Sequence, residues 1–342
     1  MPIDSIVADA IDRAITIEMR FAAGLPRGVT EPLYRAARER HGVPLTWLAA
    51  TSLKERVSHG RNVFVVTGAG APPGLPKGET DGPIGAAAIA HALEIGLGGK
   101  PILLSEARNM PAVIASTEAA GIAVVGEDIF VKRRSCALAI DFPLGSAAGE
   151  RASRELIETY DPAAIVFVEK AGPNEKGVFH SILGTPRTPD TMANAHFLAL
   201  AARDRKILTI GIADGGNEIG CGLIADAVRD VQPHGKSCGC PCGGGIGTII
   251  GCDVLVFAAV SNWGAYGVAA ALAGLLDNRE VLHDAATEWR MVHKCVDGGA
   301  MDGAYSRLIP YVDGTSDAVQ ASLITILHQI VENGLKTYDR GF

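Results

Sequence analysis

Two carboxylates precede an expected helix in the segment GLPKGETDGPIG, residues 74–85. Glu79 and Asp81 stand just before Pro83, and proline suits the first helical position, where no backbone donor is needed. Asp81 could cap this helix while Glu79 stays in solvent. Alternatively, both carboxylates lie beside a cation or a substrate ammonium, with Thr80 between them in contact with the substrate.

A second polar group lies in FVEKAGPNEKGVFHS, residues 167–181. Glu169 could act as a general base or a metal ligand, and Lys170 as an acid or an anchor for a substrate carboxylate. His180 is a candidate proton carrier, and Asn174 is expected to contact the substrate. The simpler alternative is a hydrogen-bonded histidine and a surface salt bridge.

A third group follows another apolar run in IADGGNEIGCG, residues 212–222. Asp214 and Glu218 flank Asn217, and two carboxylates with an amide suit a hard cation such as Mg²⁺ or Mn²⁺. Asp214 is expected to be catalytic as well, and Asn217 to contact the substrate. The alternative is a turn closed by Asp214 with a capped helix after it.

A fourth group is VSNWGAYG, residues 260–267. Asn262 can cap a helix, and Trp263 and Tyr266 could wall a small pocket for the substrate. Packing of the two aromatic rings against a sheet is the alternative.

A cysteine cluster stands apart in HGKSCGCPCGGGIGT, residues 234–248. One residue separates Cys238 from Cys240 and Cys240 from Cys242, whereas zinc ligands usually have two to four intervening residues and come with a second pair. Cys252 and His234 are near, but in no regular spacing. The pattern favours a glycine-rich flap with incidental or redox-sensitive thiols over zinc, and such a flap could close over the site.

Short apolar runs alternate with helical patterns from residue 62 onward, which predicts an α/β fold with a doubly wound, mostly parallel sheet and helices on both faces. The expected strands are 62–67, 101–104, 122–125, 136–141, 164–168, 207–212 and 254–260. The expected helices are 83–97, 110–120, 147–159, 189–204, 217–229, 265–276, 279–295 and 316–336, after an N-terminal helical lead-in with helices at 4–23 and 30–56.

The four polar segments each follow a predicted strand. In a doubly wound sheet the ligand crevice lies outside the carboxyl ends of the strands, so we expect these segments to meet in one site. Residues 1–60 are expected to form the lead-in and residues 61–342 the catalytic domain, together one compact unit.

Composition restricts the function further. The chain of 342 residues has a net charge of −7 and no basic stripe, so nucleic acid is not an expected partner. No secretory signal and no membrane span are expected, and seven cysteines then favour reduced thiols in the cytoplasm. The segment TGAGAPPG fits neither a P-loop nor a dinucleotide motif. Cytoplasmic α/β enzymes commonly form homo-oligomers, so a homo-oligomer is expected.

In their order and spacing, GETDGPIGA, EKAGPNEKGVFHS, DGGNEIG and SNWGAYG resemble the D-glutamate cyclase-like family over roughly residues 30–335. In animal members this unit resembles the C-terminal half of a longer mitochondrial protein. The resemblance implies a lyase of amino-acid metabolism that cyclises D-glutamate to 5-oxo-D-proline with loss of water, favoured by a divalent cation such as Mn²⁺. It attaches to Glu79, Asp81, Glu169, Asn174, His180, Asp214, Asn217, Glu218 and Asn262.

Cys221, where similar loops are expected to carry methionine, and the cysteine cluster depart from the family pattern. They leave open a lyase or hydrolase for another small amino or dicarboxylic acid, lactam, lactone or hydroxy-diacid, or a non-catalytic amino-acid- or metal-binding protein.

Cyclisation needs a neutral amine and a protonated or metal-bound leaving oxygen, which suggests roles for the polar residues. In this hypothesis Asp81, Asp214 and Glu218 lie near the metal, and Glu169 is the base. A helix start at 83 or 217 would bind the substrate's α-carboxylate.

Overall fold

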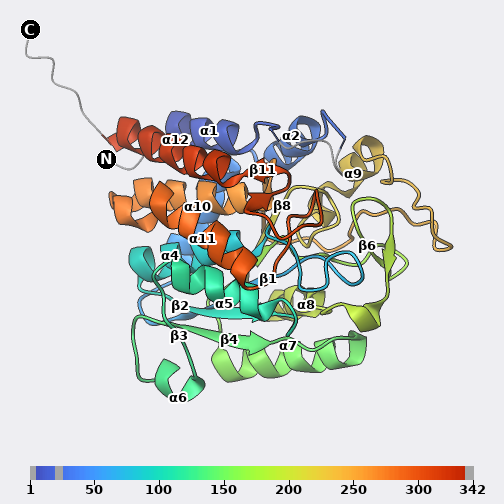
Figure 1. Cartoon of the computed structure of the whole chain (residues 1–342), viewed down its shortest axis with the longest axis horizontal. Coiled ribbons are helices and arrows are strands. Elements are labelled where there is room, and N and C mark those ends of the chain that lie inside the picture. The colour runs from blue at the N-terminus through green and yellow to red at the C-terminus, as the bar shows by residue number, and fades with distance from the viewer. Residues whose placement is uncertain (1–4, 20–25, 336–342) are drawn as a thin grey trace, which may run out of the picture.

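The computed structural model describes residues 5–19 and 26–335, and its centre is a parallel sheet of seven strands (Figure 1). The predicted α/β fold is confirmed. From one edge to the other the strands are β3 (Val124–Val125), β4 (Ala137–Asp141), β2 (Lys100–Ser105), β1 (Asn62–Thr67), β5 (Ala164–Val168), β8 (Leu208–Ala213) and β9 (Val254–Phe257).

Both faces of the sheet are covered by a hydrophobic core. Neighbouring residues of a strand point to opposite faces, so they belong to different cores. Val63 and Val65 belong to the larger core, whereas Phe64 and Val66 belong to the smaller one. The larger core involves α1 (Ser5–Ile15), α2 (Thr30–His41), α3 (Leu45–Arg56), α4 (Pro83–Leu97), α5 (Met110–Ala119), α9 (Ala225–Val231), α10 (Ser261–Leu276), α11 (Ala285–Asp297) and α12 (Asp317–Leu335). The smaller core involves α6 (Glu127–Phe130), α7 (Ser146–Tyr160) and α8 (His196–Arg205).

Helices α4 and α10 lie between the sheet and an outer layer of helices, and small residues let them approach closely (Figure 1). A Cβ atom on Gly85 of α4 would lie 2.9 Å from the Cα atom of Asn262 in α10, which is too close for any side chain. The start of α4 is therefore held directly against the start of α10.

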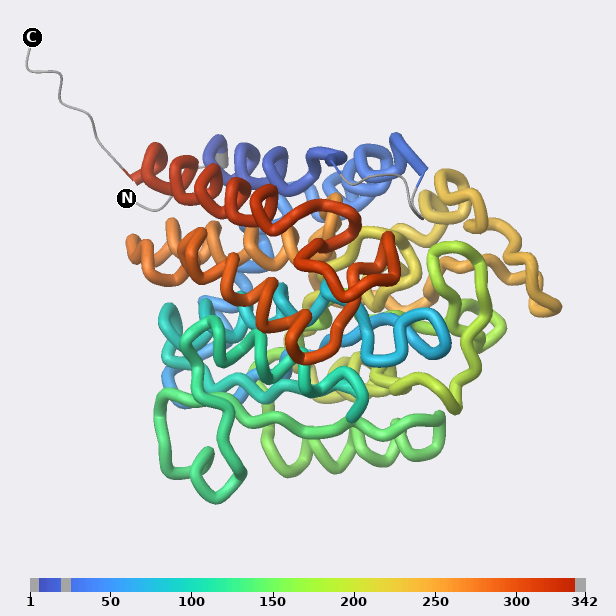
Figure 2. The backbone as a smooth tube through the Cα atoms, viewed as in Figure 1, coloured from blue at the N-terminus to red at the C-terminus, as the bar shows by residue number. Residues whose placement is uncertain are grey.

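The strand order reverses between β1 and β5, which fixes the place of the ligand crevice. After β1 the chain adds β2, β4 and β3 on one side, and it then returns to add β5, β8 and β9 on the other. The carboxyl ends of β1 and β5 border the crevice in such an arrangement. The loop after β1 also runs beside the segment before α12 (Figure 2), where Thr80 N donates to Met301 O at 2.9 Å.

Several element boundaries differ from the sequence predictions. The helix expected at 217–229 begins at Ala225, after a 3₁₀ turn at Gly222–Ile224, because backbone bridges join Glu218 to Ala171 and Gly220 to Gly251. In the lead-in, the stretch 30–56 is two helices separated at Gly42, which is left-handed with φ 74°. The helix expected at 4–23 ends at Ile15, and residues 4 and 20–23 of that prediction lie outside the described residues.

Other differences are smaller. The strand expected at 122–125 is limited to Val124–Val125, and the helices expected at 189–204 and 279–295 start at His196 and Ala285 after separate 3₁₀ turns. Two short hairpins were not predicted, namely β6 (Phe179–His180) with β7 (Pro186–Arg187) and β10 (Tyr311–Val312) with β11 (Thr315–Ser316). Among the described residues, no helix is both long and apolar enough to span a membrane.

The buried carboxylate of Asp12 attaches α1 to α3. Its oxygens accept hydrogen bonds from Leu45 N at 2.7 Å and from Thr46 N at 3.1 Å. Tyr34 Oη donates to the same carboxylate at 3.0 Å. Because Pro44 gives α3 no capping side chain of its own, Asp12 satisfies the first donors of that helix from outside it.

Replacement of Asp12 tests this attachment. We expect Asp12→Ala to lower the free energy of unfolding by about 2–3 kcal/mol, because two buried backbone donors lose their acceptor. Asp9→Ala is the matched control, since Asp9 is partly exposed and forms an ion pair with Arg38, and it should cost less than about 1 kcal/mol. Equal effects of the two substitutions in urea unfolding would contradict a capping role for Asp12.

Candidate active site

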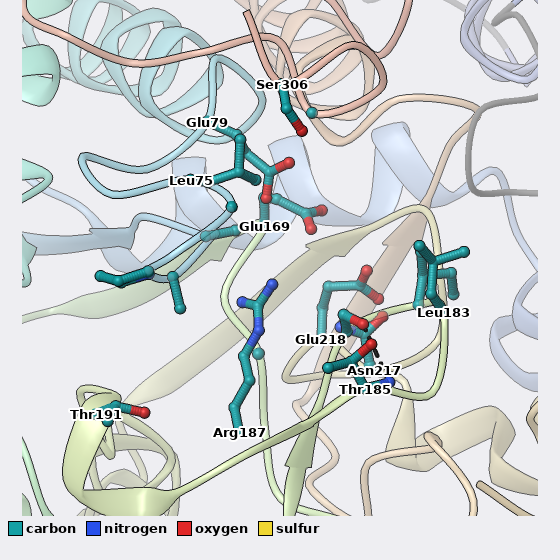
Figure 3. Close-up of a pocket in the computed structure, with 18 of the residues that line it drawn as sticks. Leu75, Glu79, Glu169, Leu183, Thr185, Arg187, Thr191, Asn217, Glu218 and Ser306 are labelled. Atoms are coloured by element: carbon teal, nitrogen blue, oxygen red, sulfur yellow. Dashed lines mark hydrogen bonds between the residues drawn. The ribbon is translucent and has the colours of Figure 1, made fainter. Parts of the chain in front are cut away.

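A cavity of about 520 Å³ opens at the carboxyl edge of the sheet, within the size range of small-molecule sites (Figure 3). Its wall is made by the loops after β1, β5 and β8, the β6–β7 hairpin and residues 303–313. The acidic residues that line it are Glu79, Glu169, Asp214, Glu218 and Asp313. Among the described lining residues Arg187 is the one basic side chain, and it points towards the carboxylates (Figure 3).

Glu169 is held at the end of β5 in an unusual backbone conformation. Its φ is +49°, in the left-handed region, which disfavours residues with a Cβ atom. Ser261 Oγ donates to Glu169 Oε2 at 2.5 Å, and Glu169 N donates to Ile212 O at 3.1 Å. Strained residues of this kind are concentrated at functional sites, and here the strain directs a carboxylate into the cavity.

Glu218 and Asn217 are fixed by the loop after β8. The Glu218 carboxylate accepts from Gly216 N at 2.7 Å and from Gly215 N at 3.2 Å. Asn217 Nδ2 donates to His180 O at 3.1 Å, which joins this loop to the β6–β7 hairpin. Within the described chain Asn217 Oδ1 is buried without a hydrogen-bond partner, so it is available to accept a proton donor in the cavity.

Asp81 and Asn262 cap each other's helices. Asp81 accepts from Ser261 N at 3.0 Å and from Asn262 N at 2.8 Å, at the start of α10. Asn262 Oδ1 accepts from Gly82 N at 2.8 Å and from Gly85 N at 2.7 Å, at the start of α4. These helix starts are therefore occupied by side chains of the chain itself, which removes the expected anion site at 83, and no helix starts at 217.

Burial and mutual repulsion shift the pKa values of these carboxyl groups. Burial raises the pKa of Glu79 to about 8, with Asp313 adding to the rise and Arg187 opposing it. Burial raises the pKa of Glu169 well above its usual range, and the charges of Glu218 and Asp214 add to this. The pKa of Asp81 is likewise raised, by burial and by Asp313, against the backbone donors of α10. A cation in the cavity would relieve this repulsion.

Two clusters of three carboxylates have a geometry that suits a hard metal ion. The first cluster is Asp81, Asp214 and Asp313, and the second is Glu169, Asp214 and Glu218. Within each cluster, one oxygen atom of each residue lies within 4.8 Å of the others. Mg²⁺ and Mn²⁺ prefer such oxygen ligands. Asp214 belongs to both clusters. The oxygens of Asp81 and Glu218 also accept hydrogen bonds from backbone donors.

Lys170 lies behind the cavity wall, in a closed ion pair. It is 1% exposed, and its Nζ atom donates to both oxygens of Glu106, at 2.8 and 2.7 Å, and to Gly68 O at 2.9 Å. Glu106 also accepts from Ala193 N at 3.0 Å. The geometry gives Lys170 a structural task, the support of the loop after β1, and it is not among the residues that line the cavity.

The remaining predicted site residues lie outside the cavity wall. Trp263 and Tyr266 pack inside α10, where Trp263 Nε1 donates to Gln320 and Tyr266 Oη donates to Glu288. Thr80 Oγ1 donates to Tyr311 O at 2.7 Å, in the junction below Glu79. Asn174 and His180 face the loop that carries the cysteine cluster.

Polar lining residues that the sequence did not indicate include Arg187, Ser306 and Asp313. Arg187 is the second residue of the two-residue strand β7, and Ser306 and Asp313 lie in the segment before α12, so none of them follows a long apolar run. A signal was available in the segment 300–316, whose glycines and charges lie between two predicted helices.

Comparisons with known proteins relate most of this chain to one family. A family model described as "D-glutamate cyclase-like, C-terminal" matches residues 39–328. The chain is 28% identical over 269 residues to a curated protein of Homo sapiens, "D-glutamate cyclase, mitochondrial". That match covers 75% of this chain and 39% of the relative, so the chain spans about two fifths of the relative's length.

The Lys170 ion pair can be tested through stability. We expect Lys170→Met to lower the free energy of unfolding by about 3–5 kcal/mol, because it leaves the Glu106 charge buried and unpaired. The double variant Lys170→Met with Glu106→Gln removes that charge and should recover part of the loss in urea unfolding. A single variant as stable as the wild type but without activity would instead assign Lys170 to the chemistry.

The raised pKa of Glu79 predicts a dependence of stability on pH. The folded state retains a proton that the unfolded chain releases above about pH 4.5, so the free energy of unfolding should fall as pH rises from about 4.5 to 8. Glu79→Gln removes this contribution, and its melting temperature relative to wild type should therefore rise over that interval in metal-free buffer. Glu39→Gln, at an exposed position of α2, serves as control. Identical pH profiles for all three proteins would contradict the raised pKa.

Proposed function

The chain belongs to the D-glutamate cyclase-like family, and from that premise we propose that it interconverts D-glutamate and 5-oxo-D-proline, with a divalent cation assisting the reaction. The observation that supports this most is the cavity with acidic groups crowded on its wall and Arg187 facing them. Acidic groups favour an ammonium, and a guanidinium favours a carboxylate. A small amino acid that carries two carboxylates fits this pattern of charge.

The substrate is oriented by its charges. Arg187 binds one carboxylate of D-glutamate, as the helix starts at α4 and α10 are already capped by Asn262 and Asp81. The ammonium lies towards Glu169, and the free acceptor of Asn217 adds a hydrogen bond to it. This arrangement folds the substrate so that its amine approaches its side-chain carboxyl group, which supplies much of the rate.

The proton balance explains why carboxyl groups with raised pKa values are useful. When the N–Cδ bond forms and a C–O bond breaks, two protons leave the substrate nitrogen and end on the departing oxygen as water. In its ionised form Glu169 takes one proton from the ammonium, and Glu79, with a pKa of about 8, is mostly protonated at neutral pH and can donate one to the departing oxygen. The second proton passes from the nitrogen to that oxygen after the N–Cδ bond has formed, and Glu169 then returns its proton to Glu79. The net reaction neither consumes nor releases a proton.

A divalent cation fits the two carboxylate clusters that share Asp214. When bound, Mn²⁺ or Mg²⁺ would polarise the reacting carboxyl group and stabilise negative charge on its oxygen. Asp214 and Glu218 would hold it, and Asp81 would complete the set of oxygen ligands, so that Glu169 remains the base.

The activity is tested by incubating the purified protein with D-glutamate or with 5-oxo-D-proline, with and without Mn²⁺, and measuring both compounds by chiral chromatography. Interconversion is expected, faster with metal. Glu169→Gln and Asp214→Asn should each lower kcat about 10²–10⁴-fold. Arg187→Met should raise KM about tenfold or more, because a charged hydrogen bond to the substrate is lost.

Matched surface substitutions serve as controls. Glu158→Gln and Arg205→Met alter an exposed ion pair between α7 and α8 and should leave both kinetic constants unchanged. If the folded protein converts neither compound, the D-glutamate assignment is wrong. A substrate panel of lactams, lactones and hydroxy-diacids then tests for a related lyase or hydrolase, and a thermal shift without product would indicate a binding protein.

A further inference from the structure

Four metal-ligand side chains meet outside the acidic cavity, although they come from separate parts of the chain. We name them the thiol–imidazole cluster: His180, Cys238, Cys240 and Cys242. The Sγ atom of Cys238 lies 3.3 Å from that of Cys240 and 3.2 Å from that of Cys242. The Nε2 atom of His180 lies 3.4 Å from Cys240 Sγ and 3.7 Å from Cys242 Sγ.

These separations are close to those around a tetrahedral metal ion. With Zn–S bonds of about 2.3 Å, tetrahedral geometry puts sulfur atoms about 3.8 Å apart, so the cluster needs to open by only a few tenths of an ångström. Three cysteines and one histidine are also an established ligand set for structural zinc. The sequence argued against zinc because only one residue separates neighbouring cysteines and a second pair of ligands was missing, whereas the fold brings His180 of β6 to the three cysteines as a fourth ligand.

The loop that carries the cysteines is attached to neighbouring segments by hydrogen bonds and close backbone packing. Asn174 Nδ2 donates to Gly245 O at 2.8 Å, and Ile246 N donates to His234 O at 3.0 Å. Gly245 has φ +75°, and a Cβ atom there would lie 2.0 Å from the carbonyl oxygen of Gly235. The loop does not line the cavity.

Polar N–H groups also point at the sulfur of Cys242. Asn174 Nδ2 and Gly244 N each lie 3.5 Å from Cys242 Sγ. Donors of this kind stabilise a metal-bound thiolate and fix its orientation. The two ring nitrogens of His180 differ. Nε2 faces the sulfur atoms, whereas Nδ1 is buried and has no hydrogen-bond partner among the described residues.

We propose that the thiol–imidazole cluster binds one Zn²⁺ ion with all four side chains, as a closed structural site separate from the acidic cavity. His180 is then a zinc ligand through Nε2 and does not carry protons for the reaction. On binding, the cysteine thiols lose their protons to solvent and the thiolates coordinate the metal.

The position of the site explains what the metal would stabilise. His180 pairs with Pro186 across the β6–β7 hairpin, and its carbonyl oxygen accepts from Asn217. The same hairpin carries Arg187, which faces the acidic groups of the cavity. A zinc ion would therefore attach this two-stranded hairpin, too short to be stable by itself, to the cysteine loop and fix one wall of the cavity.

The full chain is purified under reducing conditions without chelator, and its metals are measured by mass spectrometry of the elements. About one zinc per chain is expected. Cys240→Ser and His180→Gln should lower the zinc content at least about tenfold, whereas the neighbouring controls Cys252→Ser and His234→Gln should retain it. Asp214→Asn should also retain the zinc, and this result would distinguish the thiol–imidazole cluster from the carboxylate clusters of the cavity.

A second measurement keeps the proposal testable if the ligand variants fail to fold. Wild-type protein from cells grown with Co²⁺ should show thiolate-to-metal absorption and the intense visible bands of tetrahedral cobalt. A mercurial reagent that modifies thiols should release the metal. Absence of both metal and these bands would overturn the proposal. It would also fail if the intact mass is about two daltons low, since a disulfide would then join two of the cysteines, or if iron and sulfide replace zinc.

Discussion

The crowding of carboxyl groups at the point where the strand order reverses is the constraint on which the rest of the site depends. Like charges in a buried space repel one another, and burial adds to the cost of each charge. The fold opposes this with fixed donors: the starts of α10 and of the loop after β8 donate backbone N–H groups to Asp81 and Glu218. The remaining cost favours protonated carboxyl groups, or a cation, in the cavity.

The supporting structure is arranged around those charges. Asp81 and Asn262 exchange caps, so α4 and α10 hold two loops of the site in one fixed relation. The Lys170–Glu106 pair supports the loop after β1 from behind, out of reach of the cavity. Glu169 retains a left-handed backbone between these elements, and Ser261 directs its carboxylate.

The sequence predicted the sheet well because its strands are buried on both faces and read as short apolar runs, and it predicted that four loops meet because each follows such a run. It failed where local pattern and tertiary contact disagree. A helix was expected from residue 217, yet Glu218, Gly220 and Cys221 form bridges to neighbouring backbone. Arg187 lies on a two-residue strand, and His180 meets the cysteines only through the fold. No spacing along the chain could therefore indicate that Arg187 faces the acidic residues or that His180 lies beside the cysteines.

The most direct test of the cation-binding site is to count the protons released when Mn²⁺ binds to metal-free protein in weak buffer near pH 7. Carboxyl groups whose pKa values are raised by burial and repulsion must lose protons when a divalent cation enters. Proton release that accompanies saturation by Mn²⁺, and that falls in Asp214→Asn, is the expected result. Binding of Mn²⁺ without any proton release, or equal binding in Asp214→Asn, would contradict a cation site built from these carboxylates.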